Sequence, residues 1–387
     1  MKKNLTLLVV DYSPVVLGKD AFLVPYYWNK QNNFDVNIVY PYAENNKDMP
    51  VRNRGINHVP VKFKGTNKCF SFRGEWYFFF YLLSHAKDID VLMRFHFSFQ
   101  TALLALWYKF LKPDGTFYLK GDGFGLINSL FRKDQRIQTC ISNTFIRFIL
   151  NKMFKVVDLI SVEHNEVYEV LSKKQLGLTY SNRLVKLSNG FDEDLYNQYG
   201  IERIPFQEKE NIFLTVGRLG TFQKNTEMIL DAIKQTNMQS WKLVLIGPID
   251  TKESNFQHHI DRFYQENPEL IDKVFFTGNI SDKKTLWEWY NRSKVFILSS
   301  RSEGYALVYF EALWFDNYLI TTDVGGAKDS LDLGHGEIIP QEDPNYLALV
   351  LNNITTKKLQ VENLYNNYPI EKKQLSWNNL ITVLGNI

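Results

Sequence analysis

Residues 299–326 read SSRSEGYALVYFEALWFDNYLITTDVGG, and the rest of the chain can be interpreted outward from this stretch. The pattern predicts a strand end, a polar loop, a helix over 307–313, a strand over 319–322 and a paired-glycine turn. A helix leading into a second apolar strand is typical of a parallel sheet with crossover helices. Two acids, Glu303 and Glu311, lie on either side of the helix start, and eight helical residues rise about 12 Å.

The same alternation of short apolar runs and amphipathic segments extends over the whole chain, which predicts an α/β fold of two Rossmann-like, doubly wound domains facing across a cleft. We expect one domain over residues 1–200 and a second over 201–374, because the polar stretch 202–210 has the composition of a linker. Residues 375–387 have helical spacing and would either cap the second domain or cross back to the first. The expected strands are 5–10, 36–40, 91–95, 117–120, 159–162, 184–187, 212–216, 242–246, 274–277, 295–298 and 319–322. The expected helices are 21–30, 99–111, 226–235, 283–291, 307–313 and 345–353.

Charge is distributed unevenly in this chain of 387 residues. Residues 1–200 hold 26 Lys and Arg against 18 Asp and Glu, which gives this half a net charge of +8. The remaining residues have a net charge of −5. A basic front half favours an anionic partner there, either a membrane surface or a phosphate-bearing substrate.

Cysteine and hydropathy limit the possible classes of protein. Cys69 and Cys140 are the only cysteines and have no metal-ligand spacing, so neither a disulfide framework nor a zinc site is indicated, and a cytoplasmic location is expected. Asp11 ends the first apolar run too early for a signal peptide. The longest apolar run considered as a membrane span, residues 76–83, has eight residues against the roughly 18 required, so membrane contact would be peripheral.

The loop after the expected strand 212–216 carries the first chemical signal, VGRLGTFQKN over residues 216–225. Gly217 allows a tight turn, and Arg218 and Lys224 can approach one anion from the two ends of the loop. A planar guanidinium and a point charge together suit a diphosphate. The alternative is a solvated loop with two ordinary surface cations.

The helix that begins near Ala306 carries the second signal. Its amino-terminal amides and dipole favour a phosphate, and Gly304 permits close approach of a ligand. Glu303 has an alternative role as an acid that complements the helix dipole. Glu311 lies among apolar residues and needs a hydrogen-bond donor, which ribose hydroxyls would supply.

The combination of GRLxxxxKN, SEGYALVYFEAL and TTDVGG resembles the retaining glycosyltransferases of family 4, which have the two-domain GT-B fold. NGFD at residues 189–192, the loop 338–343 and LSWNNLI near the end extend the resemblance over residues 189–387. The resemblance implies that the C-terminal segment crosses back to the first domain.

The resemblance also implies a role for each matching residue. Arg218 and Lys224 would hold the diphosphate of a nucleotide-sugar donor, Glu311 would bind the ribose hydroxyls, and Glu303 would contact the donor sugar. Backbone amides in the same region would contact the phosphates or the sugar: those of Tyr305, Ala306 and Leu307.

The first domain departs from the family pattern. Where relatives often carry paired glycines after the first strand, this chain has the single Gly18, which we assign to donor binding. His96 follows the expected strand 91–95, where many relatives place a histidine near the reacting sugar, although a packed aromatic ring is the alternative. Asp122, between two glycines at a strand end, is a candidate for acceptor contact or catalysis, with a simple turn as the alternative.

No metal or other cofactor is expected. The two Asp-x-Asp strings, at 88–90 and 192–194, precede a strand and follow a turn, and we expect neither to bind metal. The cations of the 216–225 loop would instead neutralise the leaving diphosphate. The basic, amphipathic stretch 130–155 would lie on an anionic leaflet or pack on the sheet with an exposed basic face. A nucleic-acid partner is disfavoured because no recognised module accompanies the charge.

We therefore predict a retaining, metal-independent glycosyltransferase of the hexosyltransferase class. Its donor would be a nucleotide-diphosphate sugar, with a UDP-sugar favoured, and its acceptor a hydroxyl of a cell-surface polysaccharide or glycolipid, at the inner face of the membrane. The alternatives are a sugar-nucleotide epimerase of the same fold, a catalytically silent partner subunit, and a dinucleotide-dependent oxidoreductase. The oxidoreductase is disfavoured because no Gly-x-Gly-x-x-Gly follows the first strand.

Overall fold

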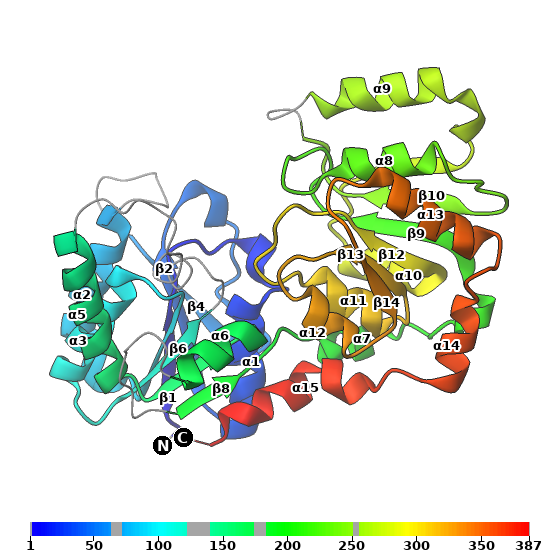
Figure 1. Cartoon of the computed structure of the whole chain (residues 1–387). Helices are drawn as coiled ribbons and strands as arrows, with labels where there is room; N and C mark the ends of the chain where they lie inside the picture. Colours follow the sequence, from blue (N-terminus) through cyan, green and yellow to red (C-terminus); the bar gives the residue numbers. More distant parts are fainter. Residues whose placement is uncertain (1, 63–71, 122–139, 174–182, 251–254, 387) are drawn as a thin grey trace. The chain divides into compact units, whose positions relative to one another are not determined.

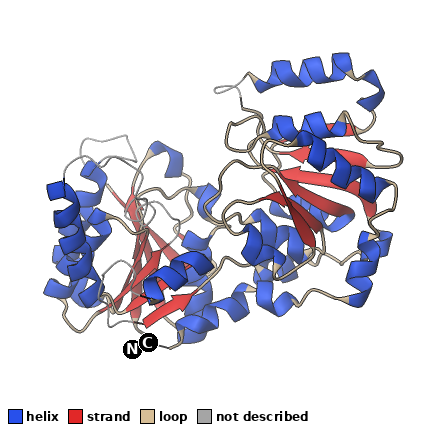
Figure 2. Ribbon diagram, viewed as in Figure 1, coloured by secondary structure: helices blue, strands red, loops and turns tan. Residues whose placement is uncertain are grey.

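The computed structural model of the chain describes residues 2–62, 72–121, 140–173, 183–250 and 255–386. The chain divides into two compact units (Figure 1). Unit 1 comprises Met1–Asn189 and Trp377–Ile387, and unit 2 comprises Gly190–Ser376. Each unit is built on one sheet with helices packed against it, as Figure 2 shows.

Unit 1 contains an eight-stranded sheet in the order β3-β4-β2-β1-β5-β6-β7-β8. Its neighbouring strands pair in parallel, except that β3 and β4 form an antiparallel hairpin. The strands are β1 (Asn4–Leu8), β2 (Asp35–Pro41), β3 (Arg52–Asn53), β4 (Ile56–Val61), β5 (Val91–Phe95), β6 (Thr116–Gly121), β7 (Leu159–Val162) and β8 (Arg183–Lys186).

Helices cover both faces of this sheet because alternate strand residues point to opposite sides. Leu92 and Leu119 face a core formed with α2 (Phe72–His85), α3 (Phe99–Leu111) and α5 (Cys140–Val156). Val91 and Tyr118 face a second core formed with α1 (Asp20–Asn32) and the C-terminal turns α15 (Trp377–Leu380) and η7 (Ile381–Leu384). A further helix, α6 (Asn165–Ser172), follows β7.

Unit 2 contains a fully parallel six-stranded sheet in the order β11-β10-β9-β12-β13-β14. The strands are β9 (Glu210–Val216), β10 (Lys242–Ile246), β11 (Val274–Gly278), β12 (Ser293–Leu298), β13 (Tyr318–Thr322) and β14 (Gly336–Ile339). The central strands are buried runs of branched and aromatic residues, as expected for a parallel sheet covered on both faces.

The two faces of this sheet again bury separate cores. Phe213 and Leu245 pack under α8 (Thr226–Ile233), α9 (Phe256–Glu266) and α13 (Pro344–Thr355). Leu214 and Val244 pack against α10 (Lys283–Arg292), α11 (Val308–Trp314) and α12 (Ala327–Leu331). The remaining helices of the unit are α7 (Glu193–Tyr199) and α14 (Val361–Asn367).

The division between the units differs from the predicted boundary at residue 200. The stretch 202–210, predicted as a linker, lies inside unit 2 and contains a 3-10 turn, Phe206–Glu208, and the first residue of β9. Phe191 explains the difference, because its ring stacks on Trp314 at 4.3 Å and is buried in the unit 2 core. At the other end, Trp377, Ile381 and Leu384 are buried in the unit 1 core.

The order of the strands places particular loops at the points where ligands bind in open parallel sheets. In unit 2 the chain winds to one side from β9 and to the other from β12, which are neighbours. The crevice at the carboxyl ends of two such strands is the usual ligand site of this architecture. The loops after β9 and β12 are residues 217–225 and 299–307, the two stretches singled out from the sequence. In unit 1 the corresponding neighbours are β1 and β5.

Within the ranges that the structure describes, we find no helix with the length and apolar character needed to cross a bilayer.

Candidate active site

The loop after β9 is shaped by its own hydrogen bonds. Thr221 Oγ1 donates to the Arg218 carbonyl at 3.3 Å, and the Lys224 amide donates to Thr221 Oγ1 at 3.4 Å. One Nη of Arg218 donates to Gln223 Oε1 at 2.6 Å. Gly220 turns the chain at φ +79°, where an added Cβ would lie 2.2 Å from the ring of Phe256. The loop therefore holds its two cations on a folded scaffold.

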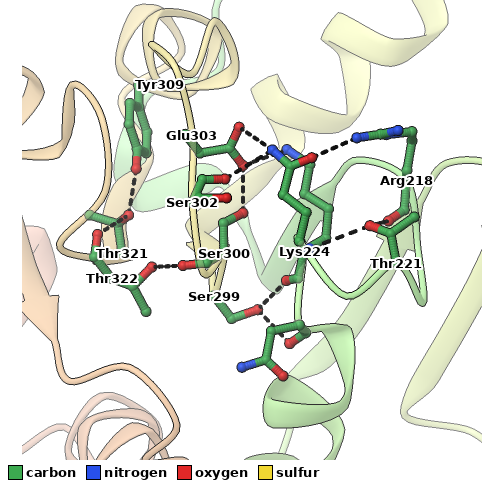
Figure 3. A network of polar contacts seen from close by, with 12 residues as sticks. Arg218, Thr221, Lys224, Ser299, Ser300, Ser302, Glu303, Tyr309, Thr321 and Thr322 are labelled. Carbon is green, nitrogen blue, oxygen red and sulfur yellow. Dashed lines mark hydrogen bonds and ion pairs between the residues drawn. The ribbon is translucent and has the colours of Figure 1, made fainter. Parts of the chain in front are cut away.

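The loop after β12 is attached directly to the loop after β9 (Figure 3). Ser299 Oγ donates to the carbonyls of Lys224 at 3.0 Å and Asn225 at 2.8 Å. Thr322, at the end of β13, donates to the Ser300 carbonyl at 2.6 Å. Hydrogen bonds at the ends of the neighbouring strands β9, β12 and β13 thus fix the position of the loop after β12 relative to the loop after β9.

Glu303 and Lys224 meet at the centre of this network. Lys224 Nζ donates to Glu303 Oε1 at 2.6 Å, and the two side chains are only 17% and 9% exposed. Ser300 Oγ donates to the same carboxylate oxygen at 2.5 Å, and Gln223 Nε2 donates to Oε2 at 3.4 Å. The cation predicted for the diphosphate and the acid predicted for the sugar therefore form one ion pair. A nucleotide sugar that binds as predicted would contact both side chains of this pair.

The paired glycines of the TTDVGG turn pack against the acid loop. A Cβ on Gly325 would lie 1.9 Å from the Gly304 carbonyl oxygen and 2.5 Å from that of Glu303. Gly326 has φ +83° and lies beside the Tyr305 ring. Glycine is required here because the backbone of one loop passes directly over the other.

The start of helix α11 is one residue later than predicted. Residues 305–307 precede the helix, with Tyr305 and Ala306 buried and Leu307 half-buried. The Tyr309 amide donates to the Ala306 carbonyl at 3.1 Å. The three predicted backbone contacts thus lie in a turn that leads directly from Glu303 into the helix.

Glu311 lies on α11 and already has donors within the protein. Its Oε1 accepts hydrogen bonds from Lys283 Nζ and from Trp287 Nε1, the latter at 3.0 Å. Burial and the nearby Glu311 carboxylate raise the pKa of Tyr290 well above its ordinary value. The sequence alone suggested ribose hydroxyls as the donors that this carboxylate needs, whereas α10 supplies two. Lys283 and Trp287 were missed because no local pattern links them to Glu311.

Arg301 links the loop after β14, residues 340–343, to the loops after β9 and β12. Its backbone amide donates to the Gln223 carbonyl at 2.8 Å, and its Nη1 donates to the Phe222 carbonyl at 2.6 Å. Its Nη2 donates to Glu342 Oε2 at 2.9 Å. Gln341 Nε2 returns a hydrogen bond to the Arg301 carbonyl at 2.9 Å. This arrangement holds the donor-side loops in place without using the residues predicted to bind the donor.

The Arg301–Glu342 pair leads to a pH prediction. The hydrogen bond from Arg301 holds the pKa of Glu342 below its ordinary value of 4.5, so the pair stabilises the fold above that pH and the contribution is lost as the pH falls through the lowered pKa. We expect Glu342→Gln to lower the free energy of unfolding at neutral pH by up to about 1 kcal/mol, because Glu342 is solvent-exposed. Urea denaturation should show this difference vanishing as the pH falls through the lowered pKa of Glu342. Glu269→Gln, at another exposed glutamate, is the control, and a difference independent of pH would contradict the assignment.

Of the residues predicted in unit 1, the structure describes Gly18 and His96. Gly18 lies between the 3-10 turn Pro14–Val16 and α1, with open space where a Cβ would be. His96 follows β5 with an exposed side chain and φ +67°, a backbone conformation that side chains rarely adopt. Its amide donates to the Lys120 carbonyl at 2.9 Å. Asp122 lies outside the described residues.

Unit 1 also contains a charged cluster that sequence reasoning missed. Lys120, at the end of β6, is fully buried and pairs with Glu163 after β7 and with Asp20 at the start of α1, the latter at 3.1 Å. The signal in the sequence was a lone lysine within the apolar strand YLKG. The cluster joins three segments at the carboxyl edge of the sheet.

One acid of each Asp-x-Asp string, Asp90 in the first and Asp192 in the second, has a structural role. Asp90 accepts hydrogen bonds from the Asn4 amide at 2.8 Å and from Lys112 Nζ at 3.0 Å. Asp192 caps α7 by accepting from the Leu195 amide at 3.3 Å. Both contacts fix the ends of secondary-structure elements.

Comparison with known proteins gives a family match that lies within unit 2. Residues 201–370 match the family model described as glycosyl transferases group 1. The amylovoran biosynthesis glycosyltransferase AmsD of Erwinia amylovora is 27% identical over 174 residues, which are 45% of this chain and 44% of that protein. An alpha-1,4-N-acetyl-D-galactosaminyltransferase of Campylobacter jejuni, named for a diNAcBac-PP-undecaprenol acceptor, is 32% identical over 165 residues, or 40% of this chain and 43% of that protein. The match thus spans less than half the length of these two curated relatives.

Solved structures show how far the fold extends. Anabaena Alr3699/HepE in complex with UDP and glucose matches with a TM-score of 0.65 at 14% identity, covering 98% of this chain and 97% of that one. The likeness therefore includes both units, and at this identity it establishes the fold alone. The chain has the GT-B fold, as predicted, and its residues 201–370 carry the sequence pattern of the group 1 glycosyl transferases.

Proposed function

We propose that this chain is a glycosyltransferase that moves a sugar from a nucleotide-diphosphate sugar to a hydroxyl of a polysaccharide or glycolipid acceptor. The observation that carries the proposal is the Lys224–Glu303 pair, which joins the loops after the adjacent strands β9 and β12. A cation and an acid at this strand junction suit the two ends of a diphosphate sugar. The match to the glycosyl transferases model over the same unit supports it.

In the proposed reaction an acceptor oxygen forms a bond to the anomeric carbon while the bond from that carbon to the β-phosphate oxygen breaks. The electron pair of the broken bond goes to the phosphate, which takes the acceptor proton. Arg218 and Lys224 stabilise the negative charge that develops there, as fixed charges do most effectively away from bulk water. Attack on the face from which the phosphate departs gives retention and needs no covalent intermediate.

We propose the remaining roles from the sequence resemblance and the chemistry of each group. Glu303 contacts the donor sugar and Glu311 the ribose, with the amides of residues 305–307 beside the phosphates. The assignment of Gly18 to donor binding rests on the sequence resemblance alone. His96 and Asp122 position the reacting groups on the acceptor side. No metal is required in this scheme, because two cations lie on the loop after β9.

The proposed donor is a UDP-sugar, and the proposed acceptors are cell-surface polysaccharides or glycolipids that are assembled at the cytoplasmic face of the membrane. The first is supported by the UDP found in a structure of the same fold, and the second by relatives named for amylovoran biosynthesis and for an undecaprenol-linked acceptor. Both relatives are transferases, which favours transfer over epimerisation. A silent partner subunit is disfavoured because the cationic and acidic residues proposed for the donor, Arg218, Lys224, Glu303 and Glu311, are all present in unit 2.

The test is to incubate the purified chain with a panel of nucleotide sugars, with and without saccharide or lipid-linked acceptors, and to identify products by mass spectrometry. We expect UDP-sugars to raise the melting temperature more than ADP- or GDP-sugars, and a glycosylated product to form only when acceptor is present. Turnover should persist in EDTA. An epimerised sugar nucleotide formed without acceptor, or protection by none of the donors, would overturn the proposal.

A further inference from the structure

Helix α2 carries apolar side chains around its whole circumference. Phe78 and Leu82 are fully buried in the unit 1 core. Trp76, Phe80 and Leu83, which are spaced along one helical face, are nevertheless 45%, 65% and 56% exposed. A helix that is apolar all round normally lies inside a protein or against a membrane. The outer side of α2 therefore lacks the polar surface that solvent alone would favour.

The exposed apolar surface continues onto α3, which packs against α2, and α5 packs in turn against α3 in unit 1. The ring of Phe79 lies 5.2 Å from Trp76 and 6.4 Å from Trp107, which stacks on Phe110 at 5.7 Å. Phe110 is 74% exposed, and Phe148 on α5 is 54% exposed. We name the exposed members the aromatic face: Trp76, Phe80, Leu83, Phe110 and Phe148.

The charge of these three helices is almost entirely positive. Their sequences contain five Lys or Arg residues against a single acid, and α3 and α5 contain no Asp or Glu. The one acid, Glu75, binds the buried Arg94 through both carboxylate oxygens, at 3.0 and 2.8 Å. Lys152 lies over the ring of Phe148 at 5.4 Å and, like Lys155, is exposed. A surface that fits this face is negatively charged at its outside and apolar beneath.

We propose that the aromatic face docks on the surface of an anionic lipid bilayer. Tryptophan and phenylalanine rings insert at the boundary between headgroups and acyl chains, while lysine stems extend along the apolar surface and place their ammonium groups among lipid phosphates. Contiguous exposed apolar surface of this kind is rare on proteins that have no partner for it. This face differs from the basic stretch predicted at residues 130–155, since most of its members lie on α2 and α3. It does not depend on the proposed transferase activity.

Flotation with vesicles tests the proposal. The full chain should float with vesicles of equal parts phosphatidylglycerol and phosphatidylcholine, and less with phosphatidylcholine alone or in high salt. Phe80→Ser combined with Phe110→Ser should reduce the bound fraction at least ten-fold. The matched control combines Leu349→Ser with Tyr368→Ser in unit 2, at side chains that are 56% and 68% exposed, and should bind as the unmodified chain does.

A second measurement locates the contact. Brominated lipids should quench tryptophan emission of the unmodified chain, and Trp76→Phe should reduce that quenching. Equal flotation of the two double variants would overturn the proposal. It would also be overturned if the unmodified chain bound no vesicles and light scattering showed that it is a dimer whereas the Phe80→Ser, Phe110→Ser variant is a monomer. That result would assign the face to a second copy of the chain. Nucleotide sugar should raise the melting temperature of the Phe80→Ser, Phe110→Ser variant as much as that of the unmodified chain. Failure of the membrane proposal can therefore be distinguished from failure of the proposed function.

Discussion

Lys224→Ala is expected to lower glycosyl transfer by about 10²- to 10³-fold while the protein remains folded. Lys224 is a fixed cation where negative charge develops on the leaving diphosphate, and such interactions act mainly in the transition state. The turnover number should therefore fall more than the Michaelis constant for the donor rises. Steady-state kinetics with the donor identified by the nucleotide-sugar panel provides the measurement.

The hydrogen bonds around Lys224 and Glu303 suggest two further variants to measure beside Lys224→Ala. Glu303 loses its cation in Lys224→Ala but keeps the hydrogen bonds from Ser300 and Gln223, so a stable fold is expected. Lys224→Arg keeps the charge and should recover part of the activity. Lys234→Ala, which removes an exposed lysine paired with Asp231 on α8, is the matched control. Near-normal turnover in Lys224→Ala would contradict the assigned role.

Glu311→Ala is expected to weaken donor binding by roughly 10- to 150-fold, the equivalent of about 1.5–3 kcal/mol for hydrogen bonds to a charged group. The loss should depend on the ribose hydroxyls if Glu311 binds them. We therefore expect the unmodified protein to bind UDP more tightly than 2′-deoxy-UDP and the variant to bind both equally weakly. Isothermal titration calorimetry of both ligands is the measurement.

A structural effect of Glu311 can be separated from its effect on the ligand. Lys283 and Trp287 lose their acceptor in the variant, but Lys283 is about one-third exposed and can return to water. Lys283→Ala should therefore change the melting temperature similarly without abolishing the preference for the 2′-hydroxyl. Glu288→Gln, at an exposed position of α10, is the control. A retained preference in Glu311→Ala would assign ribose recognition to other groups.

The sequence placed the proposed donor-side residues on their loops and helix because that information is local. Arg218 and Lys224 lie within one loop, and Glu303 and Glu311 within one loop and helix, so motif spacing places each on its element. The unit boundary was less predictable. Polar composition suggested residues 202–210 as the boundary. Phe191 nevertheless belongs to unit 2, because its ring packs against Trp287 and Trp314, which lie far along the chain.

Unit 1 was less predictable than unit 2 for a related reason. Lys120, Glu163 and Asp20 come from three distant segments, and only the order of the strands brings them together. The aromatic run of α2 was visible in the sequence, but its partial exposure was not, because the same letters describe a fully buried helix. The roles of His96 and Asp122 stay predictions.

The sequence by itself determined two α/β units with mainly parallel sheets and the chemical groups on the loops of the second unit, because apolar periodicity and loop composition are properties of short segments. Only the tertiary structure decided the partners. Lys224 pairs with Glu303 across 79 positions, and Lys283 with Glu311 across 28. These pairs form because β9 lies next to β12 and α10 packs beside α11. Strand order and helix packing follow from the collective burial of the core, which no single segment specifies.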